Sequence, residues 1–166
     1  MIFTKVGKIG KQAREELEHF RDLVTRINRI IVEKGKGSEG KVNIGNLDFC
    51  LWKALSIARK EIHRPTFHKV WAAHTLCQIA QNQSFTDGNK RTSYVIAKLI
   101  LHVGKLDFEV AEKTAKDYLI KIAIKKIPFD EVYLWIDKHS KKLERDIPEE
   151  TQEFVNTLAQ LAQEGI

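Results

Sequence analysis

The residues best suited to chemistry lie in one short polar turn, whose sequence is Phe85-Thr86-Asp87-Gly88-Asn89-Lys90-Arg91-Thr92. Gly88 has no side chain, so the backbone there can approach a ligand closely. We expect a helix to begin at about Asn89, and the unpaired amides and the dipole of a helix start attract phosphate. Lys90 and Arg91 add two cations, and Asp87 is placed to hold a divalent metal that bridges phosphate oxygens. These residue types favour a site for a phosphate-bearing ligand, although the turn taken alone is also compatible with a capped helix start carrying solvated charges.

The elements that must position this turn are helices. Apolar residues recur at steps of three and four along most of the chain, as in amphipathic helices. The segments expected to be helical are residues 11–33, 46–61, 68–82, 89–103, 110–125, 129–143 and 148–163. Pro65 interrupts the pattern within residues 62–67, where at most a short hairpin is expected. The pattern predicts an all-α fold that comprises an N-terminal amphipathic helix within residues 1–39, a core domain over 40–145 and a C-terminal helix within 146–166.

The composition is that of a folded protein with a moderate positive charge. The 166 residues, a length that suits one domain, contain 28 Lys and Arg against 22 Asp and Glu, a net charge of +6. No apolar run approaches the roughly 18 residues that span a bilayer, and the first residues lack a signal-peptide pattern, so we expect a cytoplasmic protein without a membrane partner. Cys50 and Cys77 lie in apolar segments and are expected to be buried, reduced thiols. Because no aromatic-basic interleaving accompanies the charge, we do not expect a nucleic-acid partner.

Residues 83–92, Gln-Ser-Phe-Thr-Asp-Gly-Asn-Lys-Arg-Thr, closely resemble the signature loop of the Fic/Doc (death-on-curing) family. The similarity extends over the flanking helical segments and covers roughly residues 40–138. It implies a Fic/Doc helical bundle with a short β-hairpin flap, whose members transfer a phosphate-containing group from a nucleotide to a protein hydroxyl. Many members add AMP. The Doc-like subgroup is a kinase that acts as a toxin on a translation factor and is restrained by an antitoxin chain.

Two positions favour the Doc-like subgroup. Lys90 stands where AMP-transferring members usually have Gly, and Tyr94 stands where they usually have a second Arg. The resemblance implies ATP or another nucleoside triphosphate with Mg²⁺ as ligands, a target-protein hydroxyl as acceptor and an antitoxin chain as a candidate partner. It makes Asp87 the Mg²⁺ ligand. The nucleotide-binding residues that it implies are Gly88, Asn89, Lys90 and Arg91.

The resemblance also assigns the interrupted segment to the family's flap, which holds a target segment in extended form by backbone pairing. The flap residues that it implies are Ile62, His63, Arg64, Pro65, Thr66 and Phe67. The resemblance therefore makes this segment a short hairpin that holds the target.

One departure from the family pattern bears directly on activity. The family's catalytic His falls at Gln83, and Ser84 replaces the usual Pro. The catalytic positions carried over are therefore Gln83, Asp87, Lys90 and Arg91. A carboxamide cannot take the proton of a target hydroxyl near neutral pH, and loss of a general base typically costs about 10²–10⁴ in rate. We expect transfer to be impaired while nucleotide binding is retained.

Three explanations of Gln83 stay open. It is a natural replacement that leaves a pseudoenzyme, an engineered one that silences a toxic enzyme, or part of an active enzyme in which water or the substrate phosphate accepts the proton. The alternative function is a non-catalytic module that holds a nucleotide or a protein on the same fold.

Overall fold

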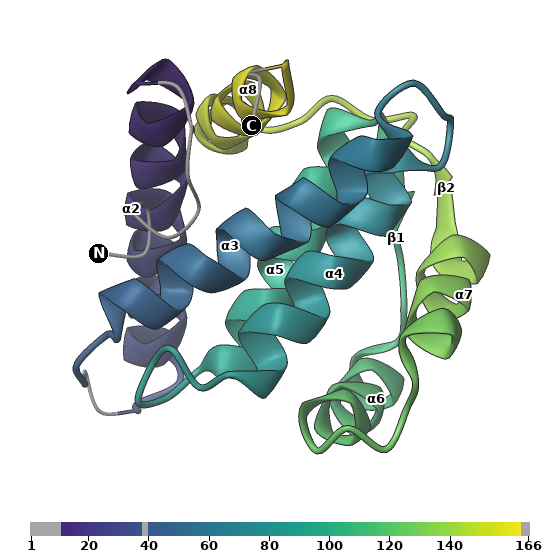
Figure 1. Cartoon of the computed structure of the whole chain (residues 1–166). Helices are drawn as coiled ribbons and strands as arrows, with labels where there is room; N and C mark the ends of the chain where they lie inside the picture. Colours follow the sequence, from purple (N-terminus) through teal and green to yellow (C-terminus); the bar gives the residue numbers. More distant parts are fainter. Residues whose placement is uncertain (1–10, 38–39, 164–166) are drawn as a thin grey trace.

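The computed structural model describes residues 11–37 and 40–163, and an all-α fold with one small antiparallel strand pair is confirmed (Figure 1). Residues 1–10 and 38–39 of the predicted N-terminal segment and residues 164–166 of the predicted C-terminal segment lie outside the described residues. In chain order the elements are α2 (Lys11–Lys34), α3 (Ile44–Ala58), the short 3₁₀ helix η1 (Arg59–Glu61), α4 (Phe67–Gln81), α5 (Asn89–Val103), β1 (Leu106–Phe108), α6 (Glu112–Ala123), α7 (Phe129–His139), β2 (Ser140–Lys142) and α8 (Glu149–Gln163).

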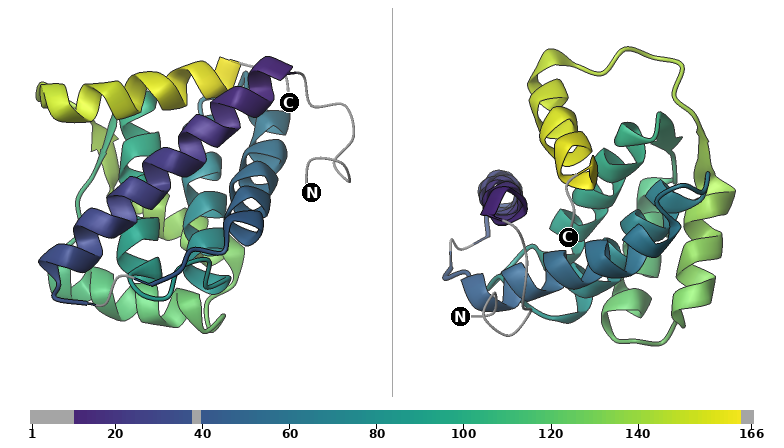
Figure 2. Two further views of the ribbon diagram at one scale, coloured as in Figure 1. Left: turned by 90° about the vertical axis from the view of Figure 1, so that its left-hand side faces the viewer. Right: turned by 45° about the horizontal axis from the view of Figure 1, so that its top comes forward.

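Helix α4 is the centre of the bundle. It buries residues on all its faces, among them Trp71, Ala72, Leu76 and Ile79, as expected for a helix that is covered on every side. It contacts α3, α5, α6 and α7. Helix α2 lies along one side of the molecule, α8 across the top, and α6 and α7 on the opposite side (Figures 1 and 2).

The terminal helices share the core of the central ones. Phe20 of α2 packs edge-on against Trp71 of α4, with 6.3 Å between the ring centroids. Leu158 and Leu161 of α8 belong to the same buried cluster. The three segments predicted from the sequence are therefore packed around one hydrophobic core.

The strand pair does not lie where the sequence indicated. β1 and β2 pair antiparallel, with Phe108 opposite Ser140, and the chain between them forms α6 and α7. Residues 62–66 form turns after η1 instead of strands, and Phe67 begins α4. The amides of Arg64 and Phe67 donate to the carbonyls of Glu61 and Arg64, so the segment satisfies its backbone locally and does not form a hairpin.

Neither cysteine forms a disulfide. Cys50 and Cys77 are buried and free, as the sequence predicted, and burial raises the pKa of Cys77 to about 12. Among the described residues, no helix combines the length and the apolar character that crossing a membrane requires.

A polar cluster is buried where α5 ends and β1 begins. His102 Nε2 lies 3.6 Å from Asp107 Oδ1, and Arg145 approaches both oxygens of this carboxylate at 3.4 Å. Burial lowers the pKa of His102 and outweighs the opposing effect of Asp107. Burial alone would raise the pKa of Asp107. The hydrogen bond and the positive charge of Arg145 outweigh this effect and hold the pKa of that carboxyl below its usual range.

The buried histidines predict a pH dependence of stability. Because the pKa of His102 is lower in the folded chain, the unfolded chain takes up the proton first, and the free energy of unfolding falls as the pH drops from about 7 towards 5. Burial lowers the pKa of His68 and His74 in the same direction. We predict that His102→Gln makes the slope shallower, by at most about 1.4 kcal/mol per pH unit.

Urea unfolding at a series of pH values measures this slope. His63→Gln, a change at an exposed imidazole, is the matched control and should retain the slope of the unchanged chain. Identical slopes for His102→Gln and the unchanged chain would show that His102 does not titrate as its burial requires.

Candidate functional site

The loop between α4 and α5 holds the polar turn in a left-handed bend. Gly88 is the N-cap of α5, with φ +78°. A Cβ at this position would lie 2.9 Å from Asn28 Nδ2 and 3.0 Å from Val32 Cγ2, both on α2. Only glycine fits here, because both the backbone conformation and the close approach of α2 exclude a side chain.

The first turn of α5 has its amides directed at the loop. The first helical hydrogen bond runs from the Thr92 amide to the Gly88 carbonyl, so the amides of Asn89, Lys90 and Arg91 have no partner within the helix. The N-cap residue, Gly88, has no side chain that could cap them. The Gly88 amide donates to Asp87 Oδ1 at 2.6 Å. This cluster of donors is suited to an anion.

The side chain of Asn89 holds the loop together. Its Nδ2 donates to the Phe85 carbonyl at 2.8 Å, and its Oδ1 accepts from the Phe85 amide at 3.1 Å. Phe85 itself is buried, as an anchor of the loop should be. Both polar atoms of the Asn89 side chain are thus used within the protein, and a ligand would meet its backbone amide.

Two neighbouring helices tether the loop. From α3, Asn46 Nδ2 donates to the Asn82 carbonyl at 2.6 Å and to Ser84 Oγ at 3.2 Å. From α2, Asn28 Nδ2 donates to the Asp87 carbonyl at 2.9 Å. Sequence reasoning did not single out either asparagine, because they lie 36 and 59 residues from their partners and no local pattern connects them.

The charged side chains of the loop lie close together and remain accessible. Arg91 Nη2 is 3.7 Å from Asp87 Oδ1, with 45% and 43% of the two side chains exposed. Arg91 Nη1 also donates to the Ile31 carbonyl. The chain after α2 packs tightly on Asp87, since a Cβ at Gly37 would lie 2.2 Å from Asp87 Oδ2. The structure thus brings Asp87, Lys90 and Arg91 to one end of α5, as the sequence predicted.

Gln83 lines both a cavity and an open groove. A cavity of about 330 Å³ on one side of the loop is lined by Gln83, Asn89, Lys90 and Ile124. An open groove of about 620 Å³ is lined by Gln83 and by the segment from Lys41 to Ile44. Gln83 is exposed and has φ +46°, a left-handed conformation that is uncommon outside glycine.

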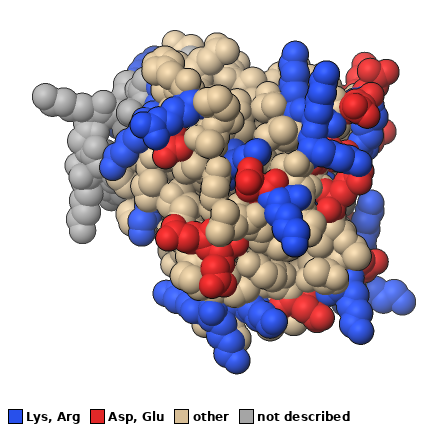
Figure 3. Space-filling model, turned by 90° about the vertical axis from the view of Figure 1, so that its right-hand side faces the viewer, with Lys and Arg blue, Asp and Glu red and all other residues tan. Residues whose placement is uncertain are grey.

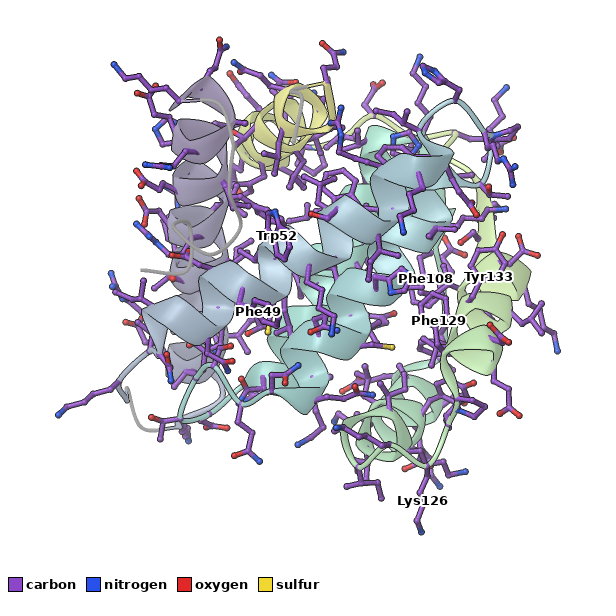
Figure 4. The ribbon with its side chains drawn as sticks, in the orientation of Figure 1. Phe49, Trp52, Phe108, Lys126, Phe129 and Tyr133 are labelled. Atoms are coloured by element: carbon purple, nitrogen blue, oxygen red, sulfur yellow. The ribbon has the colours of Figure 1, made fainter. Side chains whose placement is uncertain are left out.

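The end of α6 forms the far wall of the smaller cavity. Gln81 Nε2 donates to the Ile122 carbonyl at 3.0 Å and fixes this end against α4. Ile124 follows with 57% of its surface exposed, an apolar side chain at the edge of a polar cavity. Lys126 projects beyond it at the lower end of the molecule (Figure 4). Lys and Arg are interspersed with Asp and Glu on the α6–α7 side, so that face does not present a field of one sign (Figure 3).

The structure does not bring residues 62–67 to the loop. Residues 62–66 precede α4 and Phe67 begins it, whereas the loop follows it, and the 15 residues of α4 separate the two by about 22 Å. Arg64 and Thr66 line a different cavity of about 570 Å³, where Phe129 and Tyr133 point from α7 toward α4 (Figure 4). The segment that does lie beside the loop is residues 40–44, where Val42 forms a β-bridge with Phe85.

The residues present fit a magnesium ion only in combination with a nucleotide. Within the described ranges, no group of three or more His, Cys, Asp or Glu side chains could hold a metal. Asp87 offers one accessible carboxylate, and Mg²⁺ is commonly held by one or two carboxylates together with substrate phosphates and water.

A protein-family model described as the Fic/DOC family matches residues 18–101, just over half of the chain. The chain therefore belongs to the Fic/DOC family. The match spans α2 to α5 and includes the loop and both helices that tether it. Neither the curated proteins nor the solved structures yielded a match. The Doc-like subgroup stays a prediction.

Gly88 gives a direct test of the loop geometry. We predict that Gly88→Ala lowers the free energy of unfolding by at least about 1 kcal/mol, because a left-handed alanine is strained and its Cβ would press on Asn28. Gly45→Ala, in the exposed first turn of α3, is the control and should leave stability unchanged or raise it by up to about 1 kcal/mol. Denaturant unfolding measures both, and equal effects of the two changes would contradict the left-handed bend.

Proposed function

We propose that this chain is a nucleotide-dependent transferase of the Doc-like type, which moves a phosphate-containing group from ATP or another nucleoside triphosphate to a hydroxyl of a target protein. In its present form, transfer is impaired by Gln83. The observation that supports this proposal best is the position of Gln83 at the rim shared by a ligand-sized cavity and an open groove.

The nucleotide would occupy the cavity beside α6. The amides of the first turn of α5 that lack a partner within the helix, and the cation of Lys90, which lines this cavity, suit its phosphates. Arg91 lies on the α2 side of the loop, where it donates to the Ile31 carbonyl, and adds positive charge to the same end of α5. The exposed apolar surface of Ile124 suits the nucleoside. Asp87 would hold Mg²⁺ against the phosphate oxygens, and the ion would neutralise charge that develops there.

The target segment would lie in the groove. Asn43 donates its amide to the Ser84 carbonyl, and the Lys41 carbonyl accepts from Thr86 Oγ1, so these groups face the loop. In an extended segment, the backbone groups of Val42 then face the opposite way. An extended target peptide can pair with that edge, and residues 40–44 therefore take over the role that the sequence assigned to 62–67.

In the transfer, the target oxygen bonds to phosphorus, the bond from phosphorus to the leaving phosphate oxygen breaks, and the hydroxyl proton needs an acceptor. The Gln83 carboxamide cannot act as this acceptor. A barrier higher by roughly 3–5.5 kcal/mol corresponds to the usual effect of removing a general base.

Tyr94 favours transfer of the terminal phosphoryl group over transfer of AMP. Its ring packs against Phe108, with 5.6 Å between the centroids, and it supplies no second cation for the far phosphates. The same chain has Lys90 where AMP-transferring members usually have Gly. A translation factor as target and an antitoxin chain as restraint follow from the Doc-like resemblance alone.

The second candidate is a non-catalytic module that binds a nucleotide or a protein on the same fold. The observation that favours it is again Gln83, because such a module has no use for a general base and could still bind an anion at the amides that begin α5.

The two candidates predict different results for Gln83→His. For the transferase we predict that this variant transfers label from γ-labelled or α-labelled ATP to proteins of a cell lysate at a rate at least about 10²-fold above the unchanged chain, because the missing base is restored. The two labels also distinguish phosphoryl from AMP transfer.

The double variant Gln83→His with Asp87→Asn is the matched control, since it retains the base but lacks the carboxylate for Mg²⁺. It should return to the level of the unchanged chain. If Gln83→His binds ATP yet transfers neither label, the transferase proposal fails and the binding module is favoured.

A further inference from the structure

We propose that Asn28 of α2 is a positioning residue for the ligand, which acts by fixing the direction of the peptide group between Asp87 and Gly88. This inference rests on the proposed nucleotide site. Asn28 lies in a helix that the loop motif does not include, and it would not touch the ligand itself.

The side-chain amide nitrogen of Asn28 forms hydrogen bonds to the residues on both sides of Gly88. Nδ2 donates to the Asp87 carbonyl at 2.9 Å and to Thr92 Oγ1 at 3.1 Å. Thr92 is fully buried, and its own amide donates to the Gly88 carbonyl. These bonds join α2, the bend and the first turn of α5 into one closed ring of contacts.

Because the peptide group is planar, these bonds also fix the direction of the N–H group on its opposite side. In a trans peptide the carbonyl and the following N–H point in opposite directions. Because the Asp87 carbonyl is bound to α2, the Gly88 N–H must point away from α2. In this structure that N–H donates to Asp87 Oδ1, so Asn28 sets the direction of the amide and, through it, the position of the carboxylate assigned to Mg²⁺.

Few other side chains could do the same. The Asp87 carbonyl and Thr92 Oγ1 both accept a hydrogen bond here, and the –NH₂ group of asparagine can donate to both because it has two hydrogens on one nitrogen. An aspartate of the same shape would place a carboxylate oxygen against the Asp87 carbonyl and leave both interactions without their donor. A longer side chain would meet Gly88, whose backbone lies directly beside Asn28.

The test compares Asn28→Asp and Asn28→Ala with the unchanged chain in calorimetric titrations with ATP and Mg²⁺, at a temperature where all variants are folded. We expect both changes to raise Kd by about 10-fold or more. Asn156→Asp, the same substitution at an exposed site of α8, is the control and should leave Kd unchanged. The Gly88 amide resonance, followed by ¹⁵N–¹H NMR without ligand, should move in both Asn28 variants and not in the control.

Loss of thermal stability with an unchanged Kd would reduce Asn28 to a structural role and overturn the inference, as would an unmoved Gly88 resonance. Absence of binding by the unchanged chain is a different result, because it overturns the proposed nucleotide site and the positioning role together.

Discussion

The close approach of α2 to the bend at Gly88 is the contact on which the site depends. The left-handed backbone there leaves no room for a side chain, and Asn28 holds the carbonyl that precedes it. If the bend opened, the Gly88 amide and the Asp87 carboxylate would no longer be held beside the amides at the start of α5. The conformation of this short bend thus determines where the Asp87 carboxylate and the backbone N–H donors of the site lie.

The helices and the loop could be predicted from the sequence because both are local. Apolar spacing locates α2 to α8 to within a few residues, and the polar turn lies at the start of α5 as expected. The contacts of Asn28 and Asn46 could not be predicted, since they join residues far apart in the chain. Pro65 marks an interruption of the helical pattern but does not say whether the chain there forms strands or turns, and α4 puts this segment and the loop at its opposite ends.

The proposed function separates nucleotide binding from proton transfer. In the proposed function, phosphate would be bound by the backbone amides at the start of α5 with Lys90 and Arg91, and Asp87 would hold Mg²⁺. Proton transfer would depend on the single position of Gln83, which lines both the cavity and the groove. A chain of this kind can lose its chemistry through one side chain and retain the site, whether that replacement is natural or introduced.

The most direct test of the account is a titration of ¹⁵N-labelled protein with ATP and Mg²⁺, followed by NMR. The account predicts that the backbone amide signals of Gly88, Asn89, Lys90 and Arg91 shift most, whereas those of residues 62–64, 66 and 67 at the other end of α4 stay in place. Shifts confined to other parts of the chain, or none at millimolar nucleotide, would contradict the claim that the start of α5 is an anion site.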